Sequence, residues 1–100
     1  MSILTLPATA LRKQMRHALT HVLRGGIVII QRHGESMAII IPPSNEQAIG
    51  ESVKSVTVSE LRQNMRQMLD YILRGGSLVI QRHKESIGLM IPAENYEVVR

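Results

Sequence analysis

The stretch LRGGSLVIQRHKESIGLMIP, residues 73–92, repeats a stretch that occurs 50 residues earlier as LRGGIVIIQRHGESMAIIIP, residues 23–42. When residues 1–50 are placed against residues 51–100 without a gap, 19 positions are identical. Gap-free identity at a fixed period is the signature of an internal duplication. The sequence therefore predicts one structural unit that is present twice in the chain.

Length and composition limit what these two units can be. A chain of 100 residues is one ordinary domain or two very small ones, and a lone unit of half that length would be marginally stable. Two units that share a core are thus the economical arrangement. The absence of cysteine rules out disulfides and thiolate metal sites and is typical of a reducing compartment. The apolar runs are too short to span a bilayer, so we expect a cytoplasmic protein with no membrane partner.

Each repeat begins with a β-prone segment, residues 2–6 and 55–58, that leads into a helix. Ser59 is the candidate N-cap of the second helix, with Glu60 in its first turn, and Thr9 is the matching cap in the first. Glycine pairs at 25–26 and 75–76 end the helices. The apolar residues recur at helical spacing, at Leu11, Met15, Ala18, Leu19, Val22 and Leu23, and again at Leu61, Met65, Met68, Leu69, Ile72 and Leu73.

Two strands joined by a tight hairpin follow each helix, at 27–32 and 36–41, and at 78–82 and 86–91. These strands are apolar on both sides and need cover on both faces, whereas one helix per repeat covers only one face. We therefore expect the second face to meet the other repeat. The predicted class is α+β, with two β-α-β-β repeats packed as an intramolecular pseudo-two-fold dimer around a shared antiparallel sheet core. The repeats span residues 1–45 and 55–100, and residues 46–54 link them.

The basic residues indicate a partner. Nine of the twelve are arginine, and most occupy equivalent places in the two repeats, which suggests a polyanion of repeating geometry. A solvated face that only maintains solubility would not explain the choice of arginine. Double-stranded DNA fits, because a palindromic operator offers guanine edges and phosphates in two-fold arrangement. The predicted DNA contacts are Arg12, Arg62, Arg32, Arg82, Arg16, Arg66, Lys13, His33, His83, Lys84, Thr9 and Ser59.

The arginines fall at two kinds of position. A helix start already favours an anion, because its backbone N–H groups are unpaired, and residues four apart on a helix share a face. Arg12 and Arg62 lie at helix starts, Arg16 and Arg66 four residues later, and Arg32 and Arg82 at the ends of the first hairpin strands. The alternative is that they form surface ion pairs worth under about 1 kcal/mol each. Those pairs would join Arg32 to Glu35, Arg82 to Glu85, and Arg62 to Asp70 or Glu60.

Residues 55–97 resemble the N-terminal domain of the prevent-host-death (Phd/YefM) antitoxins. The resemblance is carried by the VSELRQN helix start, the glycine before an apolar strand, the I-x-R that ends that strand, and the IPxxxYE close. Repeat one fits more loosely, with residues 7–10 replacing the Ser-Glu start and Glu46 replacing Tyr96. The resemblance implies a β-α-β-β fold that dimerises through its sheet and binds its own operator. It also implies that the arginines at 62 and 82, and by repeat those at 12 and 32, contact DNA.

The expected function is sequence-specific DNA binding by a transcriptional regulator, most simply a repressor, which recognises a palindrome-like operator as a single-chain pseudo-dimer. Such a protein would be nucleoid-associated when bound, and further self-association on longer sites stays open. The alternative is an antitoxin or antitoxin-like module that neutralises a toxin protein. Family antitoxins wrap their toxin with a C-terminal extension, and this chain ends shortly after the motif, which we expect to disfavour that role.

We expect that the protein is not an enzyme and binds no cofactor, because the sequence offers no plausible combination of a catalytic nucleophile and a general base. His17 and His21 have a spacing that could hold a metal, but no third ligand accompanies them, and Gln67 and Tyr71 stand at the equivalent positions. The Gly-Gly pairs lack the Lys-Ser/Thr of a phosphate-binding loop. No metal site is therefore predicted.

Overall fold

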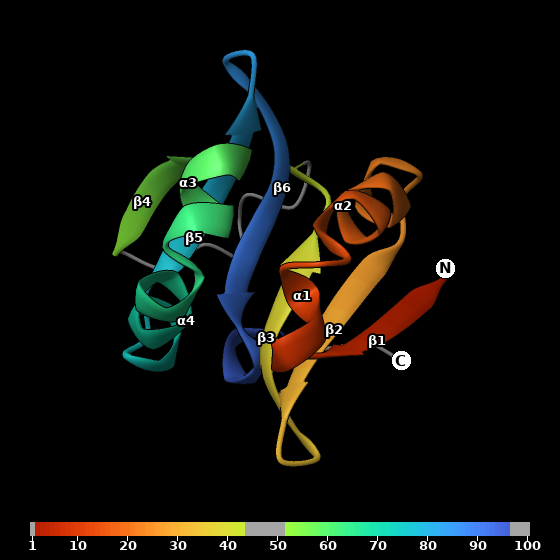
Figure 1. The fold of residues 1–100 in the computed structure, drawn as a ribbon, viewed down its shortest axis with the longest axis vertical. Coiled ribbons are helices and arrows are strands. Elements are labelled where there is room, and N and C mark those ends of the chain that lie inside the picture. The colour runs from red at the N-terminus through yellow and green to blue at the C-terminus, as the bar shows by residue number, and fades with distance from the viewer. Residues whose placement is uncertain (1, 44–51, 97–100) are drawn as a thin grey trace.

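In the part of the chain that the structure describes, six strands form one mixed sheet in the order β1-β2-β3-β6-β5-β4. The computed structural model in Figure 1 describes residues 2–43 and 52–96. The strands are β1 (Ile3–Pro7), β2 (Ile27–Arg32), β3 (Glu35–Ile41), β4 (Val53–Thr57), β5 (Ser77–Arg82) and β6 (Glu85–Pro92). The predicted α+β class and the two hairpins are confirmed. β4 starts inside the segment predicted as linker, and residues 46–51 of that segment lie outside the described residues.

The pairing pattern of the first three strands recurs 50 residues later in the last three. In each half the first strand runs parallel to the second, and the second and third strands form an antiparallel hairpin. Both hairpins have a register shift at the same place, after Ile30 in one and after Ile80 in the other. The two β-prone segments that open the repeats therefore become edge strands, each held by its own hairpin.

The halves meet through β3 and β6, which pair antiparallel at the centre of the sheet. Ile40 lies opposite Met90, flanked by Ile39 opposite Ile91 and Ile41 opposite Leu89. The sequence predicted that the repeats would meet through the second sheet face, whereas in the described residues they meet within one sheet. The repeats instead join edge to edge, because this pairing satisfies the backbone N–H and C=O groups that each apolar edge would otherwise leave unpaired.

All four helices cover the same face of the sheet (Figure 1). Their apolar residues form one cluster with alternate strand residues such as Val28, Ile30 and Ile40. The intervening strand residues, such as Ile39 and Leu89, form a second cluster against which Ala93 and Tyr96 pack. Ala93 belongs to a short 3-10 helix, Ala93–Asn95, that follows β6. The strands are therefore apolar on both sides because each face has its own cluster.

Each predicted helix is split in two. The first half has α1 (Ala8–Leu11) and α2 (Met15–Leu23), and the second has α3 (Val58–Gln63) and α4 (Met65–Leu73). The backbone leaves the helical region at Gln14, with φ −105° and ψ 19°, and at Asn64, with φ −115° and ψ 33°. Residues on either side of these breaks do not share one continuous helix face.

The start of α3 corrects the predicted cap by two residues. Thr57 is the N-cap, because the Glu60 N–H donates to Thr57 Oγ1 at 3.0 Å and the Thr57 N–H donates to Glu60 Oε1 at 2.9 Å. This reciprocal pair is a capping box. Ser59 lies inside α3, and Thr9 lies inside α1, whose N-cap Pro7 makes no side-chain capping bond. The first helix start thus lacks both bonds that hold the second.

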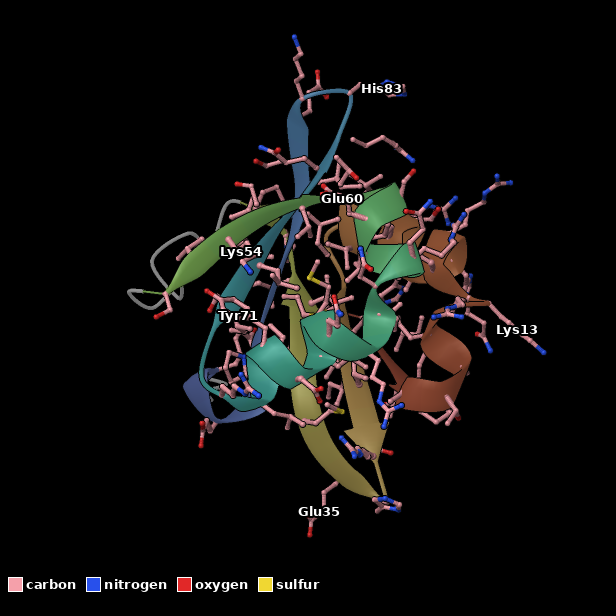
Figure 2. The ribbon with its side chains drawn as sticks, turned by 60° about the vertical axis from the view of Figure 1, so that its left-hand side comes forward. Lys13, Glu35, Lys54, Glu60, Tyr71 and His83 are labelled. Carbon is pink, nitrogen blue, oxygen red and sulfur yellow. The ribbon has the colours of Figure 1, made fainter. Side chains whose placement is uncertain are left out.

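The second helix of each half, α2 or α4, contacts the segment that opens its own half and also packs on a strand of the other half. α2 packs on β6 as well as β2, and α4 packs on β3 as well as β5. His21 Nε2–H donates to the Ser2 carbonyl oxygen at 3.0 Å, and Lys54 Nζ lies 4.7 Å from the ring centroid of Tyr71 (Figure 2). Both rings lie where a Cβ at Gly26 or Gly76 would overlap them, so the second glycine of each pair is needed for this packing.

The predicted apolar stripe is buried along most of its length. Its most exposed residue is the last one in each helix, since Leu23 and Leu73 are 50% and 51% exposed, and Met68 is partly buried. The helices end as predicted, with Gly25 at φ 90° and Gly75 at φ 96°. In the part of the chain that the structure describes, no helix is long and apolar enough to cross a lipid bilayer.

Candidate nucleic-acid interface

One groove, of about 700 Å³, gathers basic side chains from both halves of the chain. We call it the basic groove and define it by its charged and titratable lining residues, Arg12, Lys13, Arg32, His33, Arg66 and Asp70. Thr9 of α1 also lines it, and all of these residues are exposed. Three guanidinium groups and one ammonium group around one opening create a site for an anion larger than a single carboxylate.

The parallel pairing of β1 with β2 explains why the helix start and the hairpin lie together. Pro7, the N-cap of α1, is the register partner of Gln31, so α1 begins beside the end of β2. Arg32 follows Gln31, and Arg12 is the C-cap of the short α1. Arg62 lies in the last turn of the short α3, so the prediction that Arg12 and Arg62 lie at helix starts is wrong. Local sequence could place each arginine on its element, whereas this strand register brings Arg12 and Arg32 into one groove.

Arg66 reaches the same groove from the other half. It lies in the first turn of α4, and Asp70 lies one turn further along the same helix. The sequence predicted that Arg62 and Arg66 would be neighbours on one helix face, but the break at Asn64 separates their helices. The structure instead brings Arg66 together with Arg12 and Arg32, which a reading of either repeat alone could not find.

The equivalent residues of the second half are presented in the same way. Thr57 is the register partner of Gln81, which places the start of α3 beside the end of β5. Arg62 lies in the last turn of α3, and Arg82 ends β5. The predicted contacts of this set are all exposed, namely Ser59, Arg62, Arg82, His83, Lys84 and, from α2, Arg16.

The hairpin tips lie at opposite ends of the molecule (Figure 1). Both are two-residue turns with positive φ, 53° and 80° at His33 and Gly34, and 52° and 67° at His83 and Lys84. This is the type I′ pattern, which matches the twist of the flanking strands. The longest dimension of the protein is 34 Å, comparable to one turn of B-DNA, about 34–36 Å. Figure 2 shows His83 at one tip, Glu35 beside the other, and Lys13 projecting from the helical side between them.

The alternatives raised by the sequence fare differently. The carboxylate of Glu60 is engaged in the cap with Thr57, and Asp70 lies in the basic groove with Arg12 and Arg66. His21 is hydrogen-bonded to a backbone carbonyl, and the described residues contain no group of three His, Cys, Asp or Glu side chains that could hold a metal. Asp70 and Gln31 are lining residues that the sequence reasoning missed, although the Arg66–Asp70 spacing of one helical turn was a signal.

No protein-family model, curated protein or solved structure compared with the chain matches it. A functional proposal therefore depends on the geometry of these residues.

Proposed function

We propose that the chain is a sequence-specific DNA-binding regulator that acts on its operator as a single-chain pseudo-dimer of two Phd/YefM-like units. The observation that carries the proposal is the basic groove, in which the arginine that caps the end of α1, a hairpin arginine and an arginine of the other half line one opening. A guanidinium fork suits both guanine edges and phosphate oxygens, so such a cluster fits DNA better than a point-like anion.

The antiparallel pairing of β3 with β6, which we call the central seam, supports a two-fold relation between the halves. Ile40 and Met90 occupy equivalent positions in the repeats and are paired with each other. The flanking pairs, Ile39 with Ile91 and Ile41 with Leu89, exchange with one another when each residue is replaced by its repeat counterpart. A two-fold axis between Ile40 and Met90 would produce this register. Operators recognised by two-fold proteins are palindromic, with half-sites one helical turn apart.

In the proposed complex the short helices α1 and α3 would present Arg12 and Arg62, which lie at their C-terminal ends, to base edges in adjacent major grooves. Arg32, Arg82 and the histidines beside them would hold the flanking backbone. Occupation of a promoter in this way would repress transcription by excluding other proteins. A covalent pair of units also folds independently of protein concentration, unlike a small obligate homodimer.

The test is a fluorescence-anisotropy titration of the purified protein against the DNA upstream of its own gene and a scrambled duplex, across salt concentrations. We expect about a thousandfold tighter binding to its own DNA. The salt slope counts phosphate contacts, at about 0.9 for each. Equal, weak and salt-sensitive binding to both duplexes would contradict the proposal.

A matched pair of double variants separates geometry from charge. Arg12→Ala with Arg62→Ala removes the arginines at the ends of α1 and α3, and Arg24→Ala with Arg74→Ala removes the same charge from the C-caps of α2 and α4, where both residues are exposed. We expect the first variant to lose the preference for the operator and the second to retain it. An equal loss in both would show that only net charge matters.

A second groove favours a protein partner as the alternative. It has a volume of about 630 Å³, and its lining includes Met37, Ile72, Leu73 and Pro92. Leu73 is half exposed there, and an exposed apolar surface rimmed by polar residues is typical of a protein contact. The alternative is thus an antitoxin-like module that binds a toxin. A pull-down with the wild type and a Leu73→Asp variant tests it, since the variant should lose any partner that docks in this groove.

A further inference from the structure

The lining of the basic groove differs at two charged positions from the set of residues 50 positions away in the sequence, which we call the counterpart set. Lys13 and Asp70 line the basic groove, and the residues 50 positions away from them are Gln63 and Thr20. The three arginines of the groove are kept, since Arg62, Arg82 and Arg16 correspond to Arg12, Arg32 and Arg66. The two repeats thus share their arginines and differ in the polar residues beside them.

The basic groove and the counterpart set have the same formal charge despite these differences. Three arginines and one lysine against one aspartate give the basic groove a formal charge of +3, and three arginines alone give the counterpart set the same +3. Phosphate attraction depends on charge and does not distinguish the two ends of a duplex. What differs is the hydrogen-bonding type. Lysine only donates and aspartate only accepts, whereas glutamine and threonine do both.

Base edges in the major groove are distinguished by this donor and acceptor pattern. An aspartate accepts a hydrogen bond from the exocyclic amino group of cytosine, and a lysine donates to the O6 and N7 of guanine. Asp70 is also repelled by phosphate, so it gains only where such an amino group faces it. The groove that contains Lys13 and Asp70 is thus suited to a different half-site from the set that contains Gln63 and Thr20.

We infer that the chain binds an asymmetric operator in one fixed orientation, with the Lys13–Asp70 groove always on the same half-site. The inference rests on the proposed function and goes beyond it, because a two-fold regulator has no preferred orientation. In a homodimer every substitution appears in both subunits, so the two half-sites are read alike. A single chain with two repeats is free of that constraint.

The hairpin tips provide a place to observe the orientation. The chain has no cysteine, so one introduced cysteine is a unique attachment point. Glu35 and Glu85 are equivalent exposed residues beside the two tips and lie outside the basic groove. Glu35→Cys and Glu85→Cys variants would each carry an iron chelate that cleaves nearby DNA. The operator is obtained first by selecting a random duplex library on the wild-type protein.

We expect the Glu35→Cys conjugate to cleave one end of the selected operator about tenfold or more over the other, since one good base contact discriminates by that much. The Glu85→Cys conjugate should cleave the opposite end. Exchanging Lys13 with Gln63 and Asp70 with Thr20 in the same chain should move each cleavage to the other end. The exchange preserves composition and net charge, so it is its own control for general affinity.

The outcomes are distinct. Equal cleavage at both ends by each conjugate would overturn the inference while leaving sequence-specific binding intact. One-sided cleavage that the four-residue exchange does not reverse would overturn the assignment to these residues. If the library yields no preferred sequence, the proposed function itself fails. Circular dichroism of the exchanged variant checks that it folds.

Discussion

Ile40 and Met90 lie opposite each other in the central strand pair, and they also occupy equivalent positions in the two 50-residue repeats. Both are fully buried. The contact between the halves is therefore part of the core, and neither half retains its cover without the other.

Truncation at the seam should destabilise the whole protein. Ile40→Ala removes buried methyl groups beneath helices of both halves, and the expected cost in unfolding free energy is about 2–5 kcal/mol. Leu23→Ala is the control, because Leu23 is half exposed and should cost under about 1 kcal/mol. Urea denaturation followed by circular dichroism measures both. Similar midpoints for the two variants would show that the seam is not part of the cooperative core.

Removing the Ser77 hydroxyl should stabilise the protein. Ser77 is 1% exposed, its Oγ has no hydrogen-bond partner, and its counterpart in the first repeat is Ile27. A buried hydroxyl without a partner costs about 1–3 kcal/mol, so Ser77→Ala should raise the unfolding free energy by about 1 kcal/mol. Ser55→Ala, at an exposed position of β4, should change it little. A destabilised Ser77→Ala would mean that the hydroxyl has a partner in solution.

The capping box can be tested against the cap that the sequence suggested. Thr57→Ala removes the acceptor of the Glu60 N–H and should lower stability by about 1 kcal/mol. Ser59→Ala should have almost no effect on stability, because Ser59 lies inside α3. Thermal and urea unfolding of the two variants distinguish the positions. A larger loss from Ser59→Ala would restore the cap predicted from sequence.

The second hairpin contains backbone strain that the first avoids. Lys84 has φ 67°, where a side chain is disfavoured by about 1–2 kcal/mol, and Gly34 occupies the equivalent position. Glycine loses more entropy on folding, so Lys84→Gly should stabilise by only about 0.5–1 kcal/mol. The same variant should lower the salt slope of DNA binding by about 0.9 if Lys84 contacts phosphate. Gly34→Lys should have the opposite effects on both quantities.

Because residues of both halves line the basic groove, we expect two arginines from different halves to act together in DNA binding. Arg12→Ala and Arg66→Ala should be non-additive in operator affinity, with a coupling of about 0.5–3 kcal/mol, because both line one groove. Arg12→Ala combined with Arg74→Ala should add within about 0.5 kcal/mol, since Arg74 caps the far end of α4. A double-mutant cycle by anisotropy measures each pair. Additivity of Arg12 with Arg66 would mean that they contact DNA independently.

The elements were predictable because their causes are local. Apolar spacing identified the helices, and glycine pairs whose first member has a positive φ ended them. The runs around His33 and His83 formed hairpins with two-residue turns. The breaks at Gln14 and Asn64 interrupt a pattern of buried residues that continues through them, so periodicity did not reveal them. The cap was misplaced by two residues, although the Thr57–Glu60 spacing of a capping box is visible in the sequence.

By itself the sequence determined the repeat, the strands and helices, the α+β class, and which residues bear the charge. Only the tertiary structure decided that β3 pairs with β6, that the halves join edge to edge, and that Arg66 lies beside Arg12 and Arg32. The physical reason is that periodicity specifies which face of an element is buried and not which partner buries it. Two conditions select the partner: the backbone groups of two sheet edges must pair, and helices of both halves must cover one continuous apolar face. Both conditions involve residues from the whole chain, so neither can be read from one repeat.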